Sequence, residues 1–299
     1  MLDLRRMALL RELETRGSIA AVSRALGISS SAISQQLSKL EAEVGLTLLE
    51  QVGRRLELTQ AGIDLSRHAE QAVRVLEEAE SALERRRERV QGVVRFAAFS
   101  TFALRYLPAV LSRMARSHPD VVVEFSQVEP FEALDSIAGR RADVAVTDEY
   151  PGIPRRVDVG VIRTHLLRDR MIAYAPTPVE SAAALAGIPW VFEPADTDSA
   201  AWSMRICRAA GLEPHVRFES PDLRVHHMLA FSGAAAALLP EMLMQSPTAP
   251  LPEPPHRVPW RSAAALLHRD IHAVTRRGSA TRPAVAALLS HLQAVTARS

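Results

Sequence analysis

The stretch GISSSAISQQLSKLE, residues 27–41, decides how the first part of this chain folds. On a helix each residue advances by about 100°, so Ile33, Leu37 and Leu40 share one apolar stripe that can seal against a core. Another face carries serines and glutamines, although Glu and Lys are better helix formers than Ser on a solvent-exposed face. This choice of side chains indicates a helix face that is kept for contacts with another molecule.

The segments before this helix predict a helix-turn-helix. Gly17 and Ser18 provide a stop and an N-cap between two helical patterns, residues 1–16 and 19–26. The glycine that opens the quoted stretch suits the end of the second helix, and Ser29 suits the N-cap of the third. Two short helices joined by a turn that contains Gly are typical of the helix-turn-helix motif.

A short β-hairpin is expected directly after the third helix. The segment VGRRLELT, residues 52–59, alternates around Gly53, with Arg54 and Arg55 at its tip. A helix-turn-helix followed by such a hairpin is a winged helix-turn-helix. The sequence therefore predicts this fold for the N-terminal domain.

The polar face of the third helix and the hairpin tip predict contacts with double-stranded DNA. Ser and Gln can meet base edges without a fixed charge, and Gln can bind adenine through two hydrogen bonds. Arginines at a hairpin tip can hold phosphates, which fixes the register on the duplex, or enter a minor groove. The predicted DNA-binding residues are Ser30, Ser31, Ser34, Gln35, Gln36, Ser38, Lys39, Arg54 and Arg55. The alternative is a merely polar helix in a helical protein.

Residues 17–62 resemble the N-terminal signature of LysR-type transcriptional regulators. The resemblance is carried by GSIAAVSRALGISSSAISQQLSKLEAEVG followed by LTLLEQVGRRLELTQAG. The chain departs from the family pattern at Leu49, near which a bulky aromatic is usual, and at Gln51, where an arginine is usual. The second departure removes a charge near the wing and lowers the expected phosphate affinity, while the expected fold is unchanged.

A long helix is expected from its N-cap Thr59 to about Arg89. Its apolar residues alternate four and three apart, which is a heptad seam. The seam consists of Leu65, Ala69, Ala72, Leu76, Ala79 and Leu83. We interpret it as a dimerisation helix that would present two recognition helices to successive turns of DNA; the alternative is a helix packed on its own chain. The family resemblance also implies dimers and tetramers, so both a homodimer and a homotetramer stay open.

From Gly92 onward the pattern is α/β. Short apolar strands alternate with helices, which predicts parallel βαβ units. The first set has strands VVRFAAF (93–99), DVVVEFS (120–126) and ADVAV (142–146) and helices at 106–117 and 131–140. The second set has strands DRMIAYA (169–175), IPWVFEP (188–194), HVRFES (215–220) and AAALLP (235–240) and helices near 199–210 and 222–231. The strand IHAVTRR (271–277) and a helix at about 282–297 finish the chain.

This order of elements resembles the two-lobed effector domain of LysR-type regulators, which is itself similar to periplasmic binding proteins. The segments YLPAVLSRMARSHPDV, RRADVAV and FSGAAAALLP carry the resemblance, with Ala235 where a second glycine is frequent. The expected fold class is α+β and multidomain. We expect a winged helix-turn-helix at 1–60, a linker helix at 61–90 and a two-lobed α/β effector domain at 91–299. Lobe I would comprise about 91–162 and 268–299, and lobe II about 163–267.

A two-lobed α/β domain binds ligands at the carboxyl ends of its strands, in the cleft between its lobes. Ser100 and Thr101 follow the first strand and precede a helix, where they could bind an anionic effector or simply cap the helix. The predicted effector-binding residues are Ser100, Thr101, Phe102, Thr147, Asp148, Phe192, Glu193, Thr197, Ser199, Phe231 and Ser232. The aromatic members either indicate a partly apolar ligand or belong to the core.

Composition limits the other classes of protein. The single cysteine, Cys207, excludes an internal disulfide framework and a Cys-rich metal site. The longest apolar stretch, residues 228–244, is too short and too broken by polar residues and proline to span a bilayer. The N-terminus is charged and has no apolar signal core. We therefore expect a soluble, cytoplasmic protein with no membrane association.

Enzymatic and metal chemistry find little support in the sequence. His226 and His227 have no partner at metal-site spacing, and residues 231–233 lack the glycine pattern of a nucleophile elbow. No P-loop or dinucleotide fingerprint is present. We expect no cofactor, no metal and no enzymatic activity. The preferred interpretation is a ligand-responsive, sequence-specific DNA-binding regulator of transcription. The alternatives are a cytoplasmic small-molecule-binding protein whose N-terminal helices serve assembly only, and an enzyme acting in the same cleft.

Overall fold

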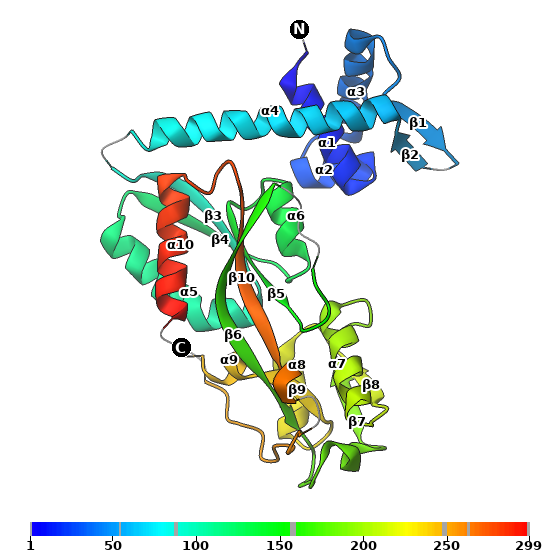
Figure 1. Cartoon of the computed structure of the whole chain (residues 1–299), viewed down its shortest axis with the longest axis vertical. Helices are drawn as coiled ribbons and strands as arrows, with labels where there is room; N and C mark the ends of the chain where they lie inside the picture. Colours follow the sequence, from blue (N-terminus) through cyan, green and yellow to red (C-terminus); the bar gives the residue numbers. More distant parts are fainter. Residues whose placement is uncertain are drawn as a thin grey trace. The chain divides into compact units, whose positions relative to one another are not determined.

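The computed structural model describes residues 1–299 except Met1, Arg54, 87–88, 156–159, 247–249, 262–263 and 298–299. Contacts within the chain divide it into two compact units. The N-terminal unit is Met1–Glu88 with Arg277–Arg282, and the C-terminal unit is Arg89–Arg276 with Pro283–Ser299. Each unit is described by itself, and its elements are labelled in Figure 1.

The N-terminal unit contains the predicted helix-turn-helix, hairpin and long helix. Its elements are α1 (Leu4–Arg16), α2 (Ile19–Leu26), α3 (Ser30–Val44), β1 (Leu49–Val52), β2 (Arg55–Leu58) and α4 (Gln60–Glu84). The predicted stops and caps are confirmed, because Gly17 and Gly27 adopt φ of 69° and 67° at the ends of α1 and α2. The side chains of Ser18, Ser29 and Thr59 accept hydrogen bonds from backbone N–H groups of the helices that follow them. The long helix ends at Glu84, five residues before the predicted end.

The apolar stripe of α3 is the centre of the N-terminal core. Ile33, Leu37 and Leu40 are all buried, as predicted from their spacing. They pack with apolar residues of the other helices and of the segment before the hairpin. These partners include Met7, Leu10, Leu13, Val22, Leu48 and Ala69.

The start of α4 fits tightly against the segment that leads into the hairpin. A Cβ atom at Gly62 would lie 2.2 Å from the Leu48 carbonyl oxygen, so this position accepts no side chain without a backbone shift. The Thr59 hydroxyl donates to the Thr47 carbonyl at 2.8 Å. These two contacts fix where α4 leaves the winged domain.

The C-terminal unit is built on a mixed six-stranded sheet and a separate pair of strands. The sheet order is β4-β3-β5-β10-β6-β9, and β7 pairs with β8. The strands are β3 (Gly92–Ala98), β4 (Val121–Gln127), β5 (Val144–Glu149), β6 (Val161–Tyr174), β7 (Pro189–Phe192), β8 (His215–Glu219), β9 (Ala237–Pro240) and β10 (His268–Arg276). The helices are α5 (Ser100–Ser117), α6 (Glu132–Ala138), α7 (Asp198–Ala209), α8 (Leu223–Phe231), α9 (Glu241–Met244) and α10 (Pro283–Thr296), with single 3-10 turns at Ala182–Leu185 and Ala264–Leu266.

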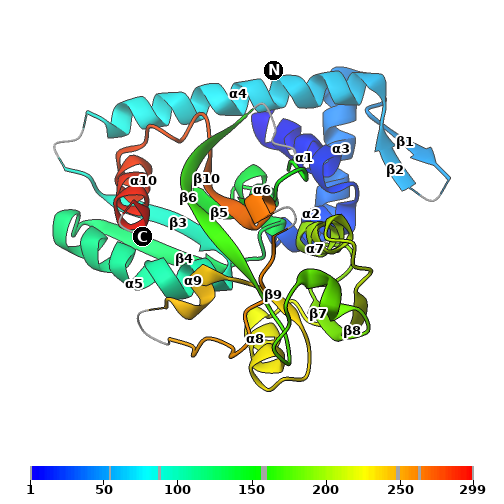
Figure 2. The same cartoon turned by 60° about the horizontal axis from the view of Figure 1, so that its bottom comes forward.

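The expected parallel pairing is confirmed in only part of this unit. β3 runs parallel to β4 and β5, and β7 runs parallel to β8. β10 is antiparallel to β5 and β6, and β9 is antiparallel to β6. The strands β6 and β10 are long and lie side by side, so they join the two ends of the unit (Figure 2).

Helix α5 begins at Ser100, six residues before the predicted start, and contains Pro108 in its interior. A proline there removes a backbone N–H and leaves the carbonyl of residue 104 without its usual helical donor. The Ser246 hydroxyl donates to that Leu104 carbonyl at 3.1 Å. A side chain from a distant part of the chain therefore takes over the lost hydrogen bond, which explains why the helix extends past the proline.

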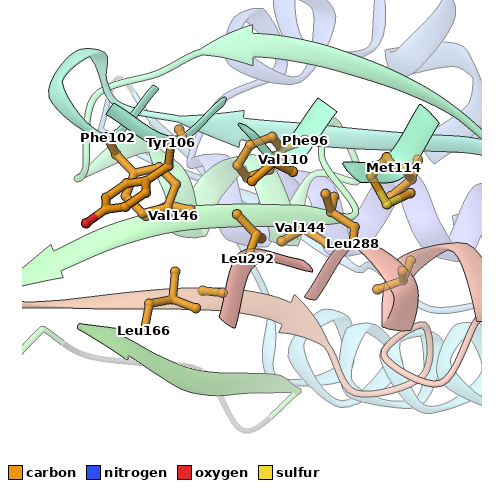
Figure 3. Close-up of a cluster of buried hydrophobic side chains, with 14 of the residues drawn as sticks. Phe96, Phe102, Tyr106, Val110, Met114, Val144, Val146, Leu166, Leu288 and Leu292 are labelled. Atoms are coloured by element: carbon orange, nitrogen blue, oxygen red, sulfur yellow. The ribbon is translucent and has the colours of Figure 1, made fainter. Parts of the chain in front are cut away.

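The last helix completes a core built mainly from the first third of the C-terminal unit. Leu288 and Leu292 of α10 are buried among Phe96, Val110 and Val144 (Figure 3). Two further buried clusters, one around Trp190 and Trp202 and one around Tyr174 and Leu239, lie at the other end of the unit. Within the described residues, no helix combines the length and the apolar character needed to cross a membrane.

Candidate functional site

The predicted recognition face of α3 is open to solvent. Six of the seven predicted residues on this helix are exposed, and the seventh, Gln36, is half-buried. The exposed residues are Ser30, Ser31, Ser34, Gln35, Ser38 and Lys39. The polar face is thus presented by one helix whose opposite stripe is locked into the core.

Hydrogen bonds divide this face into occupied and open side chains. The Ser34 hydroxyl donates to the Ser30 carbonyl at 3.0 Å, and Gln36 Oε1 accepts from Arg6 Nε at 3.0 Å. Gln35, Ser38 and Lys39 have no hydrogen-bond partner within the part of the chain that the structure describes. Their donors and acceptors are therefore free to meet a ligand such as the edge of a base.

The wing is joined to α3 by a carboxylate. Glu41 Oε1 accepts from the backbone N–H groups of Leu48 at 2.8 Å and Leu49 at 3.1 Å, which holds the start of β1 against the helix. Arg55 is exposed at the start of β2, where it pairs with Val52 across the hairpin. Arg54, the other predicted wing residue, lies outside the described residues.

The predicted dimerisation seam on α4 has two different halves. Ala69 is fully buried in the core of its own unit, and Leu65 packs against that core. Further along, Ala72 is half-buried and Ala79 is exposed, while 50% of Leu76 and 68% of Leu83 are exposed. The first half of the seam is therefore occupied within the chain, because α1 packs on it, and only the second half is open.

Two adjoining cavities in the C-terminal unit contain most of the polar residues predicted to bind an effector. One has a volume of about 170 Å³ and the other about 350 Å³. They share a wall made of Glu129, Pro130, Asp148, Glu193 and Pro221. We call the two together the cleft.

Arg269 of β10 is the central cation of the cleft and is not among the residues predicted from the sequence. Its side chain is only 2% exposed, and its guanidinium donates to Asp169 at 3.0 Å, to Asp148 at 3.2 Å and to Thr101 Oγ1 at 3.1 Å. It also lies over the Phe99 ring, 5.0 Å from the centroid. Period-two alternation on β10 places it on the same face as the buried Ile271, and this alternation was the only sequence signal for it.

A second arginine, Arg155, joins β5 to α7 and was also missed. Its guanidinium lies 3.4 Å from Asp148 and 2.8 Å from Asp198. Arg155 and Arg269 therefore share Asp148, the penultimate residue of β5. The buried Asp148 carboxylate thus links the segment after β5, through Arg155, to β10, through Arg269.

The acidic wall contains carboxyl groups with displaced pKa values. Burial raises the pKa of Glu193 to about 7, and repulsion by Asp148 and Glu129 adds to this effect, while a hydrogen bond with Ser199 and the charge of Arg269 oppose it. Burial also raises the pKa of Glu129, helped by Glu132, Asp148 and Asp222. The buried Tyr150, another residue missed from the sequence, has a raised pKa for the same main reason.

The structure brings together six of the predicted effector-binding residues and leaves five away from the cavities. Those that line the cleft are Ser100, Thr101, Asp148, Glu193, Thr197 and Ser199. Phe102 and Phe192 are buried in hydrophobic cores, and the Thr147 hydroxyl donates to the Pro130 carbonyl at 2.9 Å. Phe231 and Ser232 lie at the exposed end of α8, where the Phe231 ring stacks on His227. These five do not line either cavity.

Two family models match different parts of the chain. Residues 87–297 match the LysR substrate binding domain, and residues 4–63 match the bacterial regulatory helix-turn-helix protein model of the lysR family. The chain belongs to the LysR family. The first match covers the cleft, and the second covers α1 to the start of α4.

Named LysR-family relatives are regulators of transcription. The chain is 32% identical to the transcriptional regulator PtxR of Pseudomonas aeruginosa over 62% of its own length, and the match spans only 55% of PtxR. It is 23% identical to the transcriptional dual regulator GltC of Bacillus subtilis, over 80% of this chain and 81% of GltC.

Solved LysR-family structures share the fold over nearly the full chain. Full-length OxyR from Pseudomonas aeruginosa aligns with a TM-score of 0.64 at 16% identity, covering 98% of this chain and 95% of OxyR. CbnR, a LysR family transcriptional regulator, aligns with a TM-score of 0.52 at 22% identity, covering 97% and 99%. CbnR has also been solved in complex with its target DNA.

Proposed function

We propose that this chain is a ligand-responsive, sequence-specific DNA-binding regulator of transcription. The observation that carries the proposal is the recognition face of α3, where exposed neutral Ser and Gln side chains stand on a helix fixed by Ile33, Leu37 and Leu40. A helix face that meets only water would be more stable with Glu and Lys, which are better helix formers than Ser. The match of residues 4–63 to the family's helix-turn-helix supports the same function.

In this proposal α3 enters the major groove of double-stranded DNA. Gln35, with two free hydrogen-bonding groups, would read a base edge, and the serines and Lys39 would contact bases or phosphates around it. Arg54 and Arg55 of the wing would hold the backbone. Two copies of α3 would reach successive turns of a two-fold site in a homodimer or homotetramer, with the exposed half of the α4 seam, from Leu76 to Leu83, as the dimer contact.

The cleft would bind a small-molecule effector between lobe I, about residues 91–162 and 268–299, and lobe II, about 163–267. Its lining comes from both proposed lobes, with Thr101 and Asp148 from the first and Glu193 and Ser199 from the second. A ligand bound there would favour one relative orientation of the lobes only if it binds the two arrangements unequally. That shift would change the spacing of the paired winged domains, and with it the occupancy or bending of promoter DNA in the cytoplasm.

The first experiment is retention of sheared genomic DNA from the source organism by the purified protein at two salt concentrations. We expect enrichment of a few fragments with a shared dyad that survive the higher salt. Uniform retention that vanishes with salt would mean backbone binding only and would contradict sequence-specific regulation.

A second experiment tests the ligand half of the proposal. Replacing Thr101 by Leu fills the wall of the cleft beside Arg269 and should abolish the effect of a ligand on DNA binding, while binding of the unliganded protein to DNA persists. An unchanged ligand titration would remove Thr101 from the ligand site. The melting temperature of the variant reports whether the loss of the Arg269 contact has damaged the fold instead.

A further inference from the structure

The cleft brings together two chemically opposite features. The first is the start of the 18-residue helix α5, where Phe99, Ser100 and Thr101 line the smaller cavity. Phe99 occupies the N-cap position and makes no side-chain cap hydrogen bond, and no side-chain oxygen of the described residues accepts from the first turn. An uncapped helix start offers N–H donors and a partial positive charge, both of which suit a carboxylate.

The second feature is an excess of acidic side chains over basic ones. The cleft lining includes the carboxylates of Glu129, Asp148, Glu193, Asp196, Asp198 and Asp222. Against these stand three arginines, Arg155, Arg224 and Arg269. Because carboxylates outnumber arginines, the walls repel a ligand that carries only negative charge.

Arg269 and Arg155 are already paired with other carboxylates. Arg269 pairs with Asp148 and Asp169, and Arg155 pairs with Asp148 and Asp198. Neither Glu129 nor Glu193 forms an ion pair with any described residue, although both line both cavities.

Repulsion between these carboxylates also favours a positively charged group in the cleft. Burial is the main cause of the raised pKa values of Glu129 and Glu193, and the charge of Asp148 raises both further, while Glu129 also raises the pKa of Glu193. A positive group placed between Glu129 and Glu193 would reverse the repulsion and stabilise both ionised forms. The site therefore offers donors for an anion and acceptors for a cation within one small space.

We propose that the effector is a free amino acid, whose carboxylate binds the start of α5 beside Thr101 and whose ammonium group binds Glu129 and Glu193. This inference rests on the proposed function, because it names the class of ligand for the same cleft. A simple carboxylic acid would leave the two glutamates unpaired, and a simple amine would leave the start of α5 unfilled. The carboxylate and the ammonium group would share the smaller cavity, about 170 Å³, which Thr101, Glu129 and Glu193 all line. The side chain of the amino acid would extend into the adjoining cavity of about 350 Å³.

The test uses the full chain and the twenty proteinogenic amino acids, each added singly, with the melting temperature as the first readout and calorimetric affinity as the second. Each amino acid that binds is compared with its decarboxylated amine and with its deaminated acid. We expect at least one amino acid to raise the melting temperature, and removal of either charged group to weaken binding by at least tenfold.

Matched variants locate the ammonium group. Glu129→Gln and Glu193→Gln keep size and hydrogen bonding but remove the charge, and each should weaken binding of the amino acid by about tenfold or more. Glu124→Gln, at an exposed position on β4 outside the cleft lining, is the control and should leave affinity unchanged. Equal affinity for the amino acid and its deaminated acid would overturn the inference, as would unchanged binding by both cleft variants.

Retention of genomic DNA by the same preparation separates this inference from the proposed function. A protein that selects specific DNA but binds none of the twenty amino acids would overturn the amino-acid inference and leave the regulator intact. A protein that binds an amino acid in the cleft but selects no DNA would support the inference on the ligand and overturn the regulator.

Discussion

The recognition face of α3 and the cleft of the C-terminal unit use polar side chains in opposite ways. The recognition face is exposed and nearly neutral, lies on a single helix, and leaves Gln35, Ser38 and Lys39 without a partner among the described residues. The cleft is charged and built around the buried Arg269, which connects three segments of the chain through Thr101, Asp148 and Asp169. The residues proposed to bind DNA thus stand apart from the contacts that stabilise their unit, whereas the residues proposed to bind a small ligand take part in such contacts.

The largest expected effect is the loss of the central cation of the cleft. Arg269→Met leaves Asp148 and Asp169 buried with less compensation, and breaking a buried ion pair costs about 3–5 kcal/mol. Urea unfolding should show this loss of stability. Arg224→Met is the control, because Arg224 also lines the cleft but is exposed and has no ion pair among the described residues, and it should change stability little. A loss below about 1 kcal/mol in the Arg269 variant would mean that the network is not structural.

The second prediction tests whether the N-terminal unit has a comparably intolerant position. Gly62→Ala places a Cβ against the Leu48 carbonyl, and overpacking of this kind costs about 1–3 kcal/mol. Thermal unfolding followed by circular dichroism would measure the loss. Gln60→Ala, in the exposed first turn of α4, should have a much smaller effect. If the two variants melt alike, the close approach seen at Gly62 does not constrain the unit.

The third prediction sharpens the contrast on the recognition face itself. The double variant Ser34→Ala, Gln35→Ala should weaken specific DNA binding by about 1–3 kcal/mol, roughly tenfold to a hundredfold, because a bidentate base contact is lost. Its melting temperature and dimerisation should stay as in the original chain, since both side chains are exposed. Fluorescence anisotropy on a retained fragment measures the affinity, with Gln71→Ala on α4 as the control. Unchanged affinity would show that this face does not read the operator.

The smallest predicted effect concerns the pH dependence of stability. Glu193 has a folded-state pKa of about 7, above its ordinary value, so the folded protein holds a proton that the unfolded chain releases. Ionisation of Glu193 in the folded protein therefore lowers the free energy of unfolding. This loss is absent below pH 4.5 and complete above about pH 7. Glu193→Gln should therefore raise the free energy of unfolding by about 1 kcal/mol at pH 8 and leave it unchanged at pH 4.5. The groups that face this carboxyl, Asp148, Arg269, Glu129 and Ser199, remain in the variant, so a pH-independent effect would mean that another group dominates.

Local patterns were enough to predict the N-terminal unit, and contacts between distant residues explain what was missed elsewhere. Caps such as Ser18 and Ser29 act within a few residues, and the apolar stripe of α3 repeats at helical spacing. Arg269 acquires its role only by meeting Thr101, 168 positions away. In the same way, the Leu104 carbonyl, which Pro108 leaves without a helical donor, accepts a hydrogen bond from Ser246, 142 positions further along the chain.

The position of α10 in the first core of the C-terminal unit has a consequence for the newly made protein. Ribosomes release the N-terminus first, and domains form in that order. The core of the winged domain is complete once Ala69 has emerged, whereas the core around Phe96 waits for Leu288 and Leu292. During synthesis there is therefore an interval in which α3 and its core are formed and the core beside the proposed effector site is not. If the proposed function holds, a prematurely terminated chain that lacks α10 would bind DNA without an effector response.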